Sequence, residues 1–565
     1  MQKNESRKGQ RKMAALTIAT SLVTVPLSAG SGHAAAQRPH ELETSVFSES
    51  ARAETRAYGS KPRGRATQVE RVANMTELAA AMGRIQPGGV IEMADGVWKD
   101  AEIVFRAEAT ADRPVTLCAK TPGKVILEGN SKLSVQSPHL IVDGLHFKQS
   151  TPTNTGVVIS LNSDYGRLTN TAIDNYNPPN TNTRYQWVYI NGDYNTVDNN
   201  YFAGKNHSGP LLAQHRDSKH NTVARNHFKD IPFHNENGRE IVQVVGYGDN
   251  EELGSDGAFM TIEYNLFEHA DGEGAEIISL KSNHNLVRYN TFRGSRGGIV
   301  GRSGNNNTIQ GNFILGEKIE GTSGIRVSGQ NHTVIQNYVA DTTGIGLTLT
   351  SGEYYVDADG KPGYLTPSYE PIFRPNTPYG LVPTYGQVKN GLFAFNTFVN
   401  NGSEDIHIGY WYKNHWPRKQ LVLLPENNKI QYNLSYKAPG SVPSVTNSVY
   451  APPQDRMPPL DVFEFQPNHY KGNAVIGGQV ALHTNQGTQG FQILNSKMRK
   501  LDNGIHELAP GQMDINAGRR HFQTDHDQKL RSRGVWLDPG GDGSAIRALL
   551  NRPLTGADVG PNWMP

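Results

Sequence analysis

The sequence predicts an all-β protein built as a right-handed parallel β-helix, a coil in which every turn adds one strand to each of several parallel sheets. A short motif recurs along the chain, in which an Asn closes a β-type run and an aromatic or apolar residue usually follows. Its copies include NTVDNNYF (195–202), NTVARNHF (221–228), MTIEYNLF (260–267), NLVRYNTF (285–292), NTIQGNF (307–313) and HTVIQNYV (332–339). The later Asn residues of successive copies are separated by 26, 39, 25, 22 and 25 residues. Repeats of this length, each burying its apolar face only against its neighbours, indicate a solenoid.

The residues within each repeat favour strands over helices. Val, Ile and Phe alternate with polar residues, and helical spacing is missing, so leucine-rich and ankyrin repeats fit poorly. An Asn at a coil corner tolerates unusual backbone angles, and its amide can stack on the Asn of the next turn. The 565 residues can form one elongated domain as readily as several globular ones.

The first 36 residues predict an export signal. Five basic residues precede an apolar run from Met13 to about Leu27, and Ala34–Ala36 offers a small-residue cleavage site. We therefore expect an exported protein, periplasmic or secreted, without a lipid anchor because no cysteine directly follows the cleavage site. The apolar run is too short to span a bilayer. Cleavage would leave a slightly acidic chain, so net charge gives no reason to expect a nucleic-acid partner.

Three further segments follow the signal. Residues 37–68 lack apolar periodicity and predict a flexible leader. Residues 69–480 are assigned to the coil, beginning with a short helix over 74–82 that covers its first turn. Residues 481–565 are expected to form a C-terminal extension packed on the coil. The single cysteine, Cys118, excludes an internal disulfide and is expected to be a small buried side chain.

Two intervals between repeats exceed the period and predict loops that leave the coil, one between Asn226 and Asn265 and one between Asn337 and Asn396. The second is rich in Pro and Tyr. Tyr354 and Tyr355 are candidates for stacking on sugar rings, and the alternative is that they pack the loop onto the coil.

The stretch from Asp271 to Arg302 concentrates charge in a pattern typical of a catalytic site. It carries Glu273, Glu276, Lys281 and Arg302, with the arginine 21 residues after the lysine. In a coil with turns of that length, the lysine and arginine lie side by side on adjacent strands. Glu276 and Lys281 differ by five positions and would face opposite ways on a straight strand, so we expect a coil corner between them. The alternative for these charges is a solvated surface.

These residues resemble polysaccharide lyase family 6, the alginate lyases and chondroitinase B-like enzymes, which are parallel β-helices. The resemblance covers most of the chain after residue 70. It rests on NGRE (237–240), DGE (271–273), EIISLKS (276–282) and Arg302, with weaker support from NYFAGKNHSGPLL (200–212), SGIRVSGQNHTVIQNY (323–338) and LTGADVGPNW (554–563).

The resemblance implies that Asn237, Glu273 and Glu276 bind Ca²⁺, that Lys281 is the base and that Arg302 is the acid. The family pattern has its two acids two positions apart, whereas Gly274 and Ala275 separate the two glutamates here. Either a β-bulge returns both to one face, or Glu240 or Asp271 takes over as a ligand.

The chemistry of the residue types agrees with that implication. Side-chain oxygens suit Ca²⁺, which neutralises a uronate carboxylate and so eases removal of the adjacent proton. The base must be uncharged, a state that the nearby cations Arg302 and Arg326 favour in Lys281. Arg302 gives up protons reluctantly, so we expect it to polarise the leaving oxygen. The residues expected to contact the substrate are Arg326, Lys205, His207, Tyr354 and Tyr355.

The sequence therefore predicts an enzyme that cleaves an acidic polysaccharide by Ca²⁺-assisted β-elimination. Alginate is the first choice of substrate, and a dermatan sulfate or chondroitin-type chain is the alternative. A β-helix that binds glycans without cleaving them is the competing class. His207, His234 and His284 are the alternative bases.

Overall fold

The structure is a computed structural model. It describes residues 66–153, 156–234, 237–246, 256–356, 362–364, 385–411, 415–416, 419–438, 440, 442–448, 467–482, 490–508 and 552–564. All of these belong to one compact unit, Ser60–Pro565.

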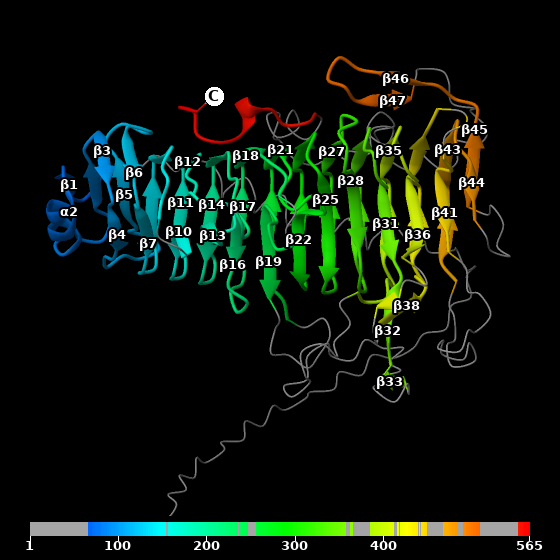
Figure 1. The fold of residues 1–565 in the computed structure, drawn as a ribbon, viewed down its shortest axis with the longest axis horizontal. Helices are drawn as coiled ribbons and strands as arrows, with labels where there is room; N and C mark the ends of the chain where they lie inside the picture. Colours follow the sequence, from blue (N-terminus) through cyan, green and yellow to red (C-terminus); the bar gives the residue numbers. More distant parts are fainter. Residues whose placement is uncertain are drawn as a thin grey trace, which may run out of the picture. The chain divides into compact units, whose positions relative to one another are not determined.

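Three parallel sheets form a parallel β-helix, as the sequence predicts (Figure 1). The chain passes through sheet 1, sheet 2 and sheet 3 in each turn, so a strand pairs with strands one turn before and one turn after it. Sheet 1 contains β1 (Val69–Val72), β2 (Val90–Met93), β5 (Val115–Ala119), β8 (Leu140–Asp143), β11 (Arg167–Thr169), β14 (Thr196–Asp198), β17 (Thr222–Ala224), β20 (Thr261–Glu263), β23 (Leu286–Arg288), β26 (Thr308–Gln310), β29 (Thr333–Ile335), β34 (Leu392–Ala394), β39 (Lys429–Gln431) and β42 (His469–Lys471).

The other two sheets are described in the same order along the coil. Sheet 2 contains β3 (Gly96–Lys99), β6 (Val125–Glu128), β9 (Leu145–Lys148), β12 (Ala172–Asp174), β15 (Tyr201–Ala203), β18 (His227–Ile231), β21 (Leu266–Ala270), β24 (Thr291–Arg293), β27 (Phe313–Leu315), β30 (Tyr338–Ala340), β35 (Thr397–Val399), β40 (Leu434–Tyr436), β43 (Asn473–Ile476) and β45 (Phe491–Leu494). Sheet 3 contains β4 (Glu102–Phe105), β7 (Lys132–Val135), β10 (Gly156–Leu161), β13 (Tyr185–Ile190), β16 (Leu212–Gln214), β19 (Val242–Gly246), β22 (Glu276–Ser282), β25 (Gly297–Ser303), β28 (Thr322–Val327), β31 (Leu347–Thr350), β36 (Ile406–Tyr410), β41 (Val445–Asn447) and β44 (Val480–Ala481).

Smaller elements lie outside the three sheets. They are the helix α2 (Met75–Met82), the antiparallel strands β32 (Gly352–Val356), β33 (Pro362–Tyr364), β37 (His415–Trp416) and β38 (Lys419–Leu423), the hairpin of β46 (Met498–Lys500) and β47 (His506–Leu508), and the 3₁₀ turn η2 (Gly556–Asp558).

The predicted helix over the first turn is confirmed. The Asn74 side chain accepts a hydrogen bond from the Glu77 backbone N–H at 2.9 Å, which caps the start of α2. Leu78 and Ala81 of the helix are buried in the core. Cys118 is also buried, as expected. In the part of the chain that the structure describes, no helix has the length and apolar character needed to cross a bilayer.

The interior of the coil is a continuous apolar column in which equivalent side chains stack from turn to turn. Phe202, Phe228, Phe267 and Phe292 come from consecutive strands of sheet 2, and successive ring centroids are 5.4, 4.7 and 4.6 Å apart. Such a column is stabilised only by neighbouring turns, which fixes the register of every strand. The outward side chains of one sheet are therefore held in straight rows.

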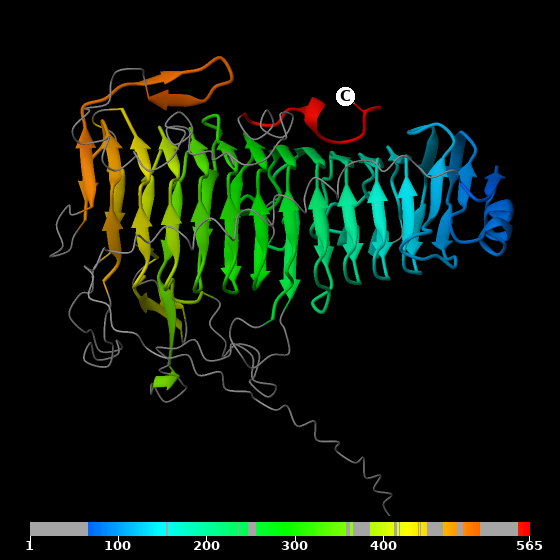
Figure 2. The same ribbon diagram turned by 180° about the vertical axis from the view of Figure 1, so that it is seen from behind.

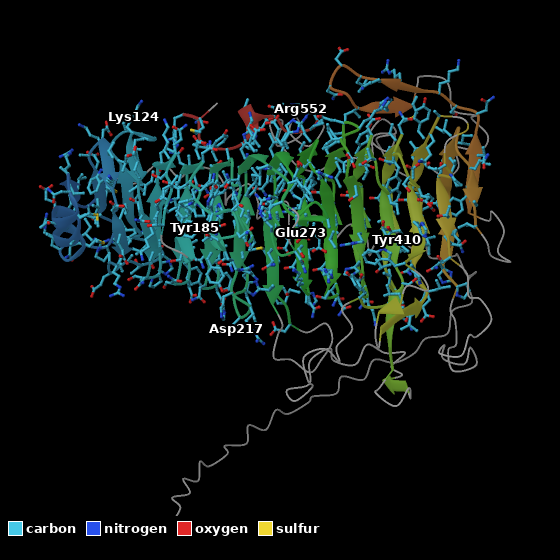
Figure 3. The ribbon with its side chains drawn as sticks, viewed as in Figure 1. Lys124, Tyr185, Asp217, Glu273, Tyr410 and Arg552 are labelled. Atoms are coloured by element: carbon cyan, nitrogen blue, oxygen red, sulfur yellow. The ribbon has the colours of Figure 1, made fainter. Side chains whose placement is uncertain are left out.

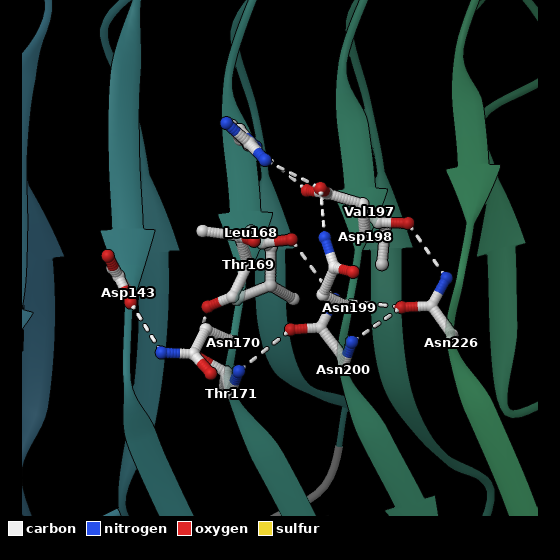
Figure 4. Close-up of polar contacts among 11 residues, drawn as sticks. Asp143, Leu168, Thr169, Asn170, Thr171, Val197, Asp198, Asn199, Asn200 and Asn226 are labelled. Atoms are coloured by element: carbon white, nitrogen blue, oxygen red, sulfur yellow. Dashed lines mark hydrogen bonds and ion pairs between the residues drawn. The ribbon is translucent and has the colours of Figure 1, made fainter. Parts of the chain in front are cut away.

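The motif asparagines form the predicted ladder. In Figure 4, the Asn200 amide nitrogen donates to the Asn226 side-chain oxygen at 3.0 Å. The same side-chain contact continues through asparagines 265, 290, 312, 337, 396, 433 and 473. One detail differs from expectation, because the left-handed backbone falls on the residue before the ladder asparagine, as at Asn199 and Tyr289. The ladder residue supplies the amide and its predecessor makes the bend.

Two C-terminal segments lie against the outer surface of sheet 2. Ile505 beside the hairpin packs with Phe313 and Tyr338, and the segment 552–564 runs over earlier strands of the same sheet. The Leu554 N–H donates to the Thr291 hydroxyl at 2.8 Å, and the Trp563 ring N–H donates to the Asn170 side chain at 3.1 Å. Figures 1 and 2 show both segments on one side of the coil. Neither of these two described segments covers sheet 3.

Candidate active site

The charged stretch of the sequence lies on the outer face of sheet 3, centred on β22. No corner separates Glu276 from Lys281, so that expectation is wrong, since both belong to one strand. A β-bulge places the two side chains on one face instead. Ile277 and Ile278 both point into the core, and the pairing with β25 shifts between Glu276 and Ile278. The extra inward residue returns Glu276 to the outer face that carries Lys281.

A second irregularity positions the arginine. In the pairing of β22 with β25, Leu280 faces Gly301 while Lys281 faces Ser303. Arg302 is thus the additional residue of β25, on the strand next to Lys281. Arg326 lies one strand further, on β28, opposite Val300 of β25. The sequence spacing correctly places the three cations on successive strands, but it does not reveal the shift.

Three glutamates converge beside these cations. Glu240 precedes β19, Glu273 lies in the turn before β22, and Glu276 begins β22. One carboxylate oxygen from each lies within 4.8 Å of the others. Figure 3 labels Glu273 on the sheet 3 side of the coil. Of the alternatives for a third acidic ligand, Glu240 therefore lies in the cluster, whereas Asp271 accepts a hydrogen bond from the Arg296 backbone at 2.9 Å and lies outside it.

The cations contact two of the three glutamates. The Lys281 ammonium is 2.7 Å from Glu240 Oε1. Arg302 and Arg326 both approach Glu276 Oε1, at 3.3 and 2.8 Å. The sequence predicted that cations surround Lys281, and the structure adds a carboxylate, so the amine faces charges of both signs. Neighbouring outward residues support the acids, because Gln243 donates to Glu240 and Ser279 donates to Glu276.

Burial and mutual repulsion set the acidities of the cluster. Burial first, and then the charges of Glu240 and Glu276, raise the pKa of Glu273 to about 7. Burial of Glu240 opposes its ionisation, but the charge and hydrogen bond of Lys281 outweigh that effect and lower the pKa of Glu240. Within the described residues Glu273 makes no ion pair, and its Oε2 accepts the Gly238 N–H at 2.8 Å. The least compensated negative charge of the site is therefore at Glu273.

Aromatic rings cover both arginines. The Arg302 guanidinium lies 4.7 Å from the centroid of the Tyr385 ring, and that of Arg326 lies 4.9 Å from the Trp411 ring. Trp411 follows β36. Tyr385 lies in the second of the two predicted loops, the one between Asn337 and Asn396 that is rich in Pro and Tyr. Burial works against charge on Arg302, yet Tyr385 and Glu276 raise its pKa. Sequence reasoning missed Trp411, because no local pattern connects residue 411 with residue 326.

Several predicted substrate contacts lie elsewhere. Lys205 is only 1 % exposed, and its ammonium donates to three backbone carbonyls, those of residues 207, 208 and 209. The His207 ring is also buried, and its nitrogens contact Asn177 and the Tyr185 carbonyl. Burial lowers the pKa of His207 far below its usual value. The structure thus places both residues inside the wall of the coil, where they support the loop before β16.

The remaining candidates have the following positions. Asn237 is exposed and directly precedes Gly238, whose N–H contacts Glu273. His284 stacks on Phe259 at 4.9 Å, in a row of rings along one corner. His234 is half-buried and its backbone N–H donates to the Gly272 carbonyl. The side chains of Tyr354 and Tyr355 lie outside the described residues.

The donor set fits a hard divalent cation. Three carboxylates supply only oxygen ligands, the type that Ca²⁺ takes in proteins. Burial, and then the like charges of Glu240 and Glu276, raise the pKa of Glu273, and a bound cation would offset that repulsion. Among the residues described, no other group of three His, Cys, Asp or Glu side chains converges in this way.

Comparison with known proteins places the chain in a family. Residues 72–349 match the chondroitinase B family. No curated protein matches the chain. A PL6 family polysaccharide lyase from Pseudopedobacter saltans is 39% identical, with 88% of this chain and 99% of that chain covered and a TM-score of 0.67.

Two further solved structures share the fold. The PL6 family alginate lyase AlyGC is 26% identical, with 88% of this chain and 59% of that chain covered and a TM-score of 0.67. A mannuronic acid specific family 6 lyase from human gut microbiota is 24% identical, with 76% of this chain and 91% of that chain covered and a TM-score of 0.61. The extent and identity of the first match show that the chain belongs to polysaccharide lyase family 6.

Proposed function

We propose that the protein cleaves a uronate-containing polysaccharide, with alginate as the first substrate to test, by β-elimination on the outer face of sheet 3. One observation carries the proposal. Lys281, Arg302 and Arg326 and the three clustered glutamates lie on one outer face, each cation within 3.3 Å of a carboxylate oxygen. Family membership supplies the reaction class, and this arrangement supplies groups for each part of the reaction.

Lys281 is assigned as the base. β-Elimination transfers the proton on C5 of the uronate to the lysine amine, moves the C5–H electron pair into a new C4–C5 double bond, and breaks the bond from C4 to the glycosidic oxygen. Lys281 is 19 % exposed at its side chain, so part of it reaches the outer surface of sheet 3 while Glu240 holds its amine in place. Two of the three alternative bases are less suitable, because His207 is buried and His284 is part of a ring stack.

Arg302 is assigned to the leaving oxygen. A guanidinium stays charged and cannot readily donate a proton, so Arg302 stabilises the developing negative charge while protonated Lys281 or water returns the proton. Arg326, which shares Glu276 Oε1 with Arg302, is positioned to bind a uronate carboxylate. After proton return, the products are a new reducing end and an unsaturated uronate end.

Glu273, Glu276 and Asn237, together with Glu240, are the residues proposed to hold Ca²⁺. When bound, Ca²⁺ would neutralise the charge of the uronate carboxylate and so lower the barrier to removing the adjacent proton. Arg302 and Arg326 keep Glu276 Oε1 engaged, and Ser279 donates to Oε2 of the same carboxylate, so the side chain has one fixed orientation.

The cellular setting and the division of the chain are part of the same proposal. Residues 1–36 serve as an export signal cleaved near Ala36, and residues 37–68 as a leader. The coil of residues 69–480 carries the site, and residues 481–565 form the extension. A polymeric substrate that does not enter cells requires export of the enzyme that degrades it, which agrees with these assignments.

The test is digestion of purified uronans by the full-length protein. Alginate, its mannuronate-rich and guluronate-rich fractions and dermatan sulfate are incubated with enzyme and Ca²⁺, while the ultraviolet absorbance of unsaturated ends is followed. We expect absorbance to rise with alginate, to stop on chelation and to recover with added Ca²⁺, while circular dichroism shows an intact fold. Cleavage to saturated ends would contradict a lyase, and full turnover after exhaustive chelation would contradict the Ca²⁺ assignment.

A further inference from the structure

We infer that Tyr385 and Trp411 form an aromatic bracket that positions the guanidinium groups of Arg302 and Arg326 for the proposed reaction. The inference rests on the proposed function for its kinetic consequence, and on geometry for the bracket itself. Both rings come from beyond residue 349, where the match to the chondroitinase B family ends. The bracket therefore adds late turns of the coil to a site whose charges lie on earlier turns.

The two arginines would not hold their positions through Glu276 alone. A single carboxylate oxygen accepts from both guanidiniums, at 3.3 Å from Arg302 and 2.8 Å from Arg326. One shared acceptor leaves each long side chain free to rotate about that contact. The aromatic rings remove this freedom, because each lies against one guanidinium, at centroid distances of 4.7 and 4.9 Å.

The rings brace each other. Tyr385 and Trp411 meet edge to face, with centroids 5.2 Å apart, and Trp411 also packs against Tyr410 at 5.1 Å. Tyr385 is 8 % exposed, so it is fixed by its surroundings. Trp411 has a φ of 65°, the left-handed region that a bulky residue adopts only when its surroundings require it. Packing holds both rings in one orientation, and the rings hold the arginines.

The bracket also explains an uncompensated donor. The Arg302 Nε is buried and has no hydrogen-bond partner within the described residues. A buried donor without an acceptor costs free energy and is typical of a functional position. With its face against Tyr385 and one terminal nitrogen on Glu276, Arg302 is held in place although this donor has no acceptor among the described residues. Trp411 and Tyr385 are thus positioning residues, which act through the arginines.

Kinetics of single and paired substitutions test the bracket. Trp411→Leu is expected to lower kcat/KM roughly 2- to 30-fold, the range that corresponds to one cation–π contact. The loss should fall mainly on kcat, because the arginines act as charge develops. Trp411→Phe keeps an aromatic face and should recover most of the loss. In an Arg326→Ala background, Trp411→Leu should cause a smaller loss than in wild type, because only its effect through Tyr385 and Arg302 remains.

Tyr385 is tested in the same way against Arg302. Tyr385→Leu should lower kcat, and Tyr385→Phe should retain it because the ring remains. Tyr165→Leu and Trp563→Leu are the matched controls. Tyr165 has an exposed ring and follows β10, which is four strands before β22 in sheet 3. Trp563 lies on sheet 2. Because both rings lie away from the arginines, both variants should keep wild-type turnover.

Spectroscopy separates failure of the bracket from failure of the proposed function. The near-ultraviolet circular dichroism difference between wild type and Trp411→Phe reports Trp411 alone, and Arg326→Ala should change that difference even without any substrate. An unchanged spectrum, or additive kinetic losses in the double variant, would overturn the bracket. A raised KM with unchanged kcat would assign Trp411 to direct sugar stacking instead. Absence of turnover in the wild type would overturn the proposed function and leave the spectral test standing.

Discussion

At the residue scale, the site depends on how one carboxylate is shared. Glu276 is 1 % exposed, and its two oxygens accept from Arg302 and Arg326 on one side and from Ser279 on the other. A buried carboxylate is tolerated only with such partners. Lys281 differs, because among the described residues its amine pairs with one carboxylate and its side chain is 19 % exposed. We therefore propose that Glu276 organises the site and that Lys281 is the residue that reacts.

Replacing Lys281 tests the assignment of the base. Lys281→Ala should lower kcat by at least about 10²- to 10⁴-fold, the contribution typical of general-base catalysis. Lys281→Arg should fail equally, since a guanidinium stays charged at working pH. Initial rates on alginate give the measurement, and calorimetric Ca²⁺ binding is the control for an intact site. A Lys281→Ala variant that retained most of its turnover would direct attention to another base.

Titration of His146 predicts how stability depends on pH. Burial, followed by the charge of Lys148, lowers the pKa of His146 from 6.5 to about 4. Above pH 6.5 the ring is neutral in both folded and unfolded chains, so its titration takes nothing from the free energy of unfolding. As the pH falls from 6.5 towards 4, only the unfolded chain takes up the proton, and stability falls by about 1.4 kcal/mol per pH unit.

The comparison uses His146→Leu, which lacks the titrating group. Between pH 7.5 and pH 5, wild type should lose about 2 kcal/mol more unfolding free energy than the variant, as seen in urea titrations. Equal pH dependence in wild type and His146→Leu would show that the buried ring is not the cause.

At the element scale, the asparagine ladder and the bulge in β22 have different functions. The ladder joins consecutive turns through buried amides, and it sets the axial register of sheet 3 along with the rest of the coil. The bulge at Ile277 is local, and it alone decides that Glu276 faces outward. A regular strand there would bury Glu276 in the apolar column.

Breaking the ladder should destabilise the coil without touching the reacting groups. Asn290 accepts from the Asn265 N–H and amide, each at 3.0 Å, and donates to Asn312 at 3.0 Å. Asn290→Ala leaves buried partners unsatisfied, so it should cost about 1–3 kcal/mol or more. The exposed Asn162→Ala should stay within about 0.5 kcal/mol of wild type. Thermal melting measures both, and equal melting temperatures would contradict a structural role for the ladder.

At the scale of the whole molecule, the C-terminal segment 552–564 connects distant parts of the chain. Trp563 lies directly on Gly123, where a Cβ would come within 2.3 Å of the ring, and its ring is 5.4 Å from His146. Leu554 and Val559 pack with Leu266 further along sheet 2. These contacts cover apolar surface on a different sheet from the site.

Deleting residues 552–565 should therefore separate stability from catalysis. Exposure of Leu266 and its apolar neighbours should lower the melting temperature, since apolar area returns to water. At a temperature where both proteins are folded, kcat on alginate should stay at the wild-type value. Trp563→Phe is the milder change, and its melting temperature should lie between those of the wild type and the deletion variant. Loss of turnover with an unchanged melting temperature would show that the segment serves the site instead.

Much of the fold and part of the site can be predicted from the sequence, because each turn of the coil repeats the same local sequence pattern. The recurring Asn motif predicts the β-helix and the ladder, and the 21-residue spacing predicts that Lys281 and Arg302 lie on adjacent strands. The capping helix follows from Asn74 and the helix formers after it. Each of these depends on contacts within one turn or between one turn and the next, and such contacts are encoded in short-range periodicity.

Tertiary structure decided the details that make these residues a site. The bulge at Ile277, the inclusion of Glu240 in the acidic cluster and the burial of Lys205 and His207 do not follow from alternation or spacing. A bulge forms where packing against both neighbouring strands favours an extra residue, and a buried lysine is stable only where carbonyls converge on it. The contact of Trp411 with Arg326 joins turns far apart in sequence. The sequence by itself determined which residues share a face of the coil, and only three-dimensional packing decided which of them touch.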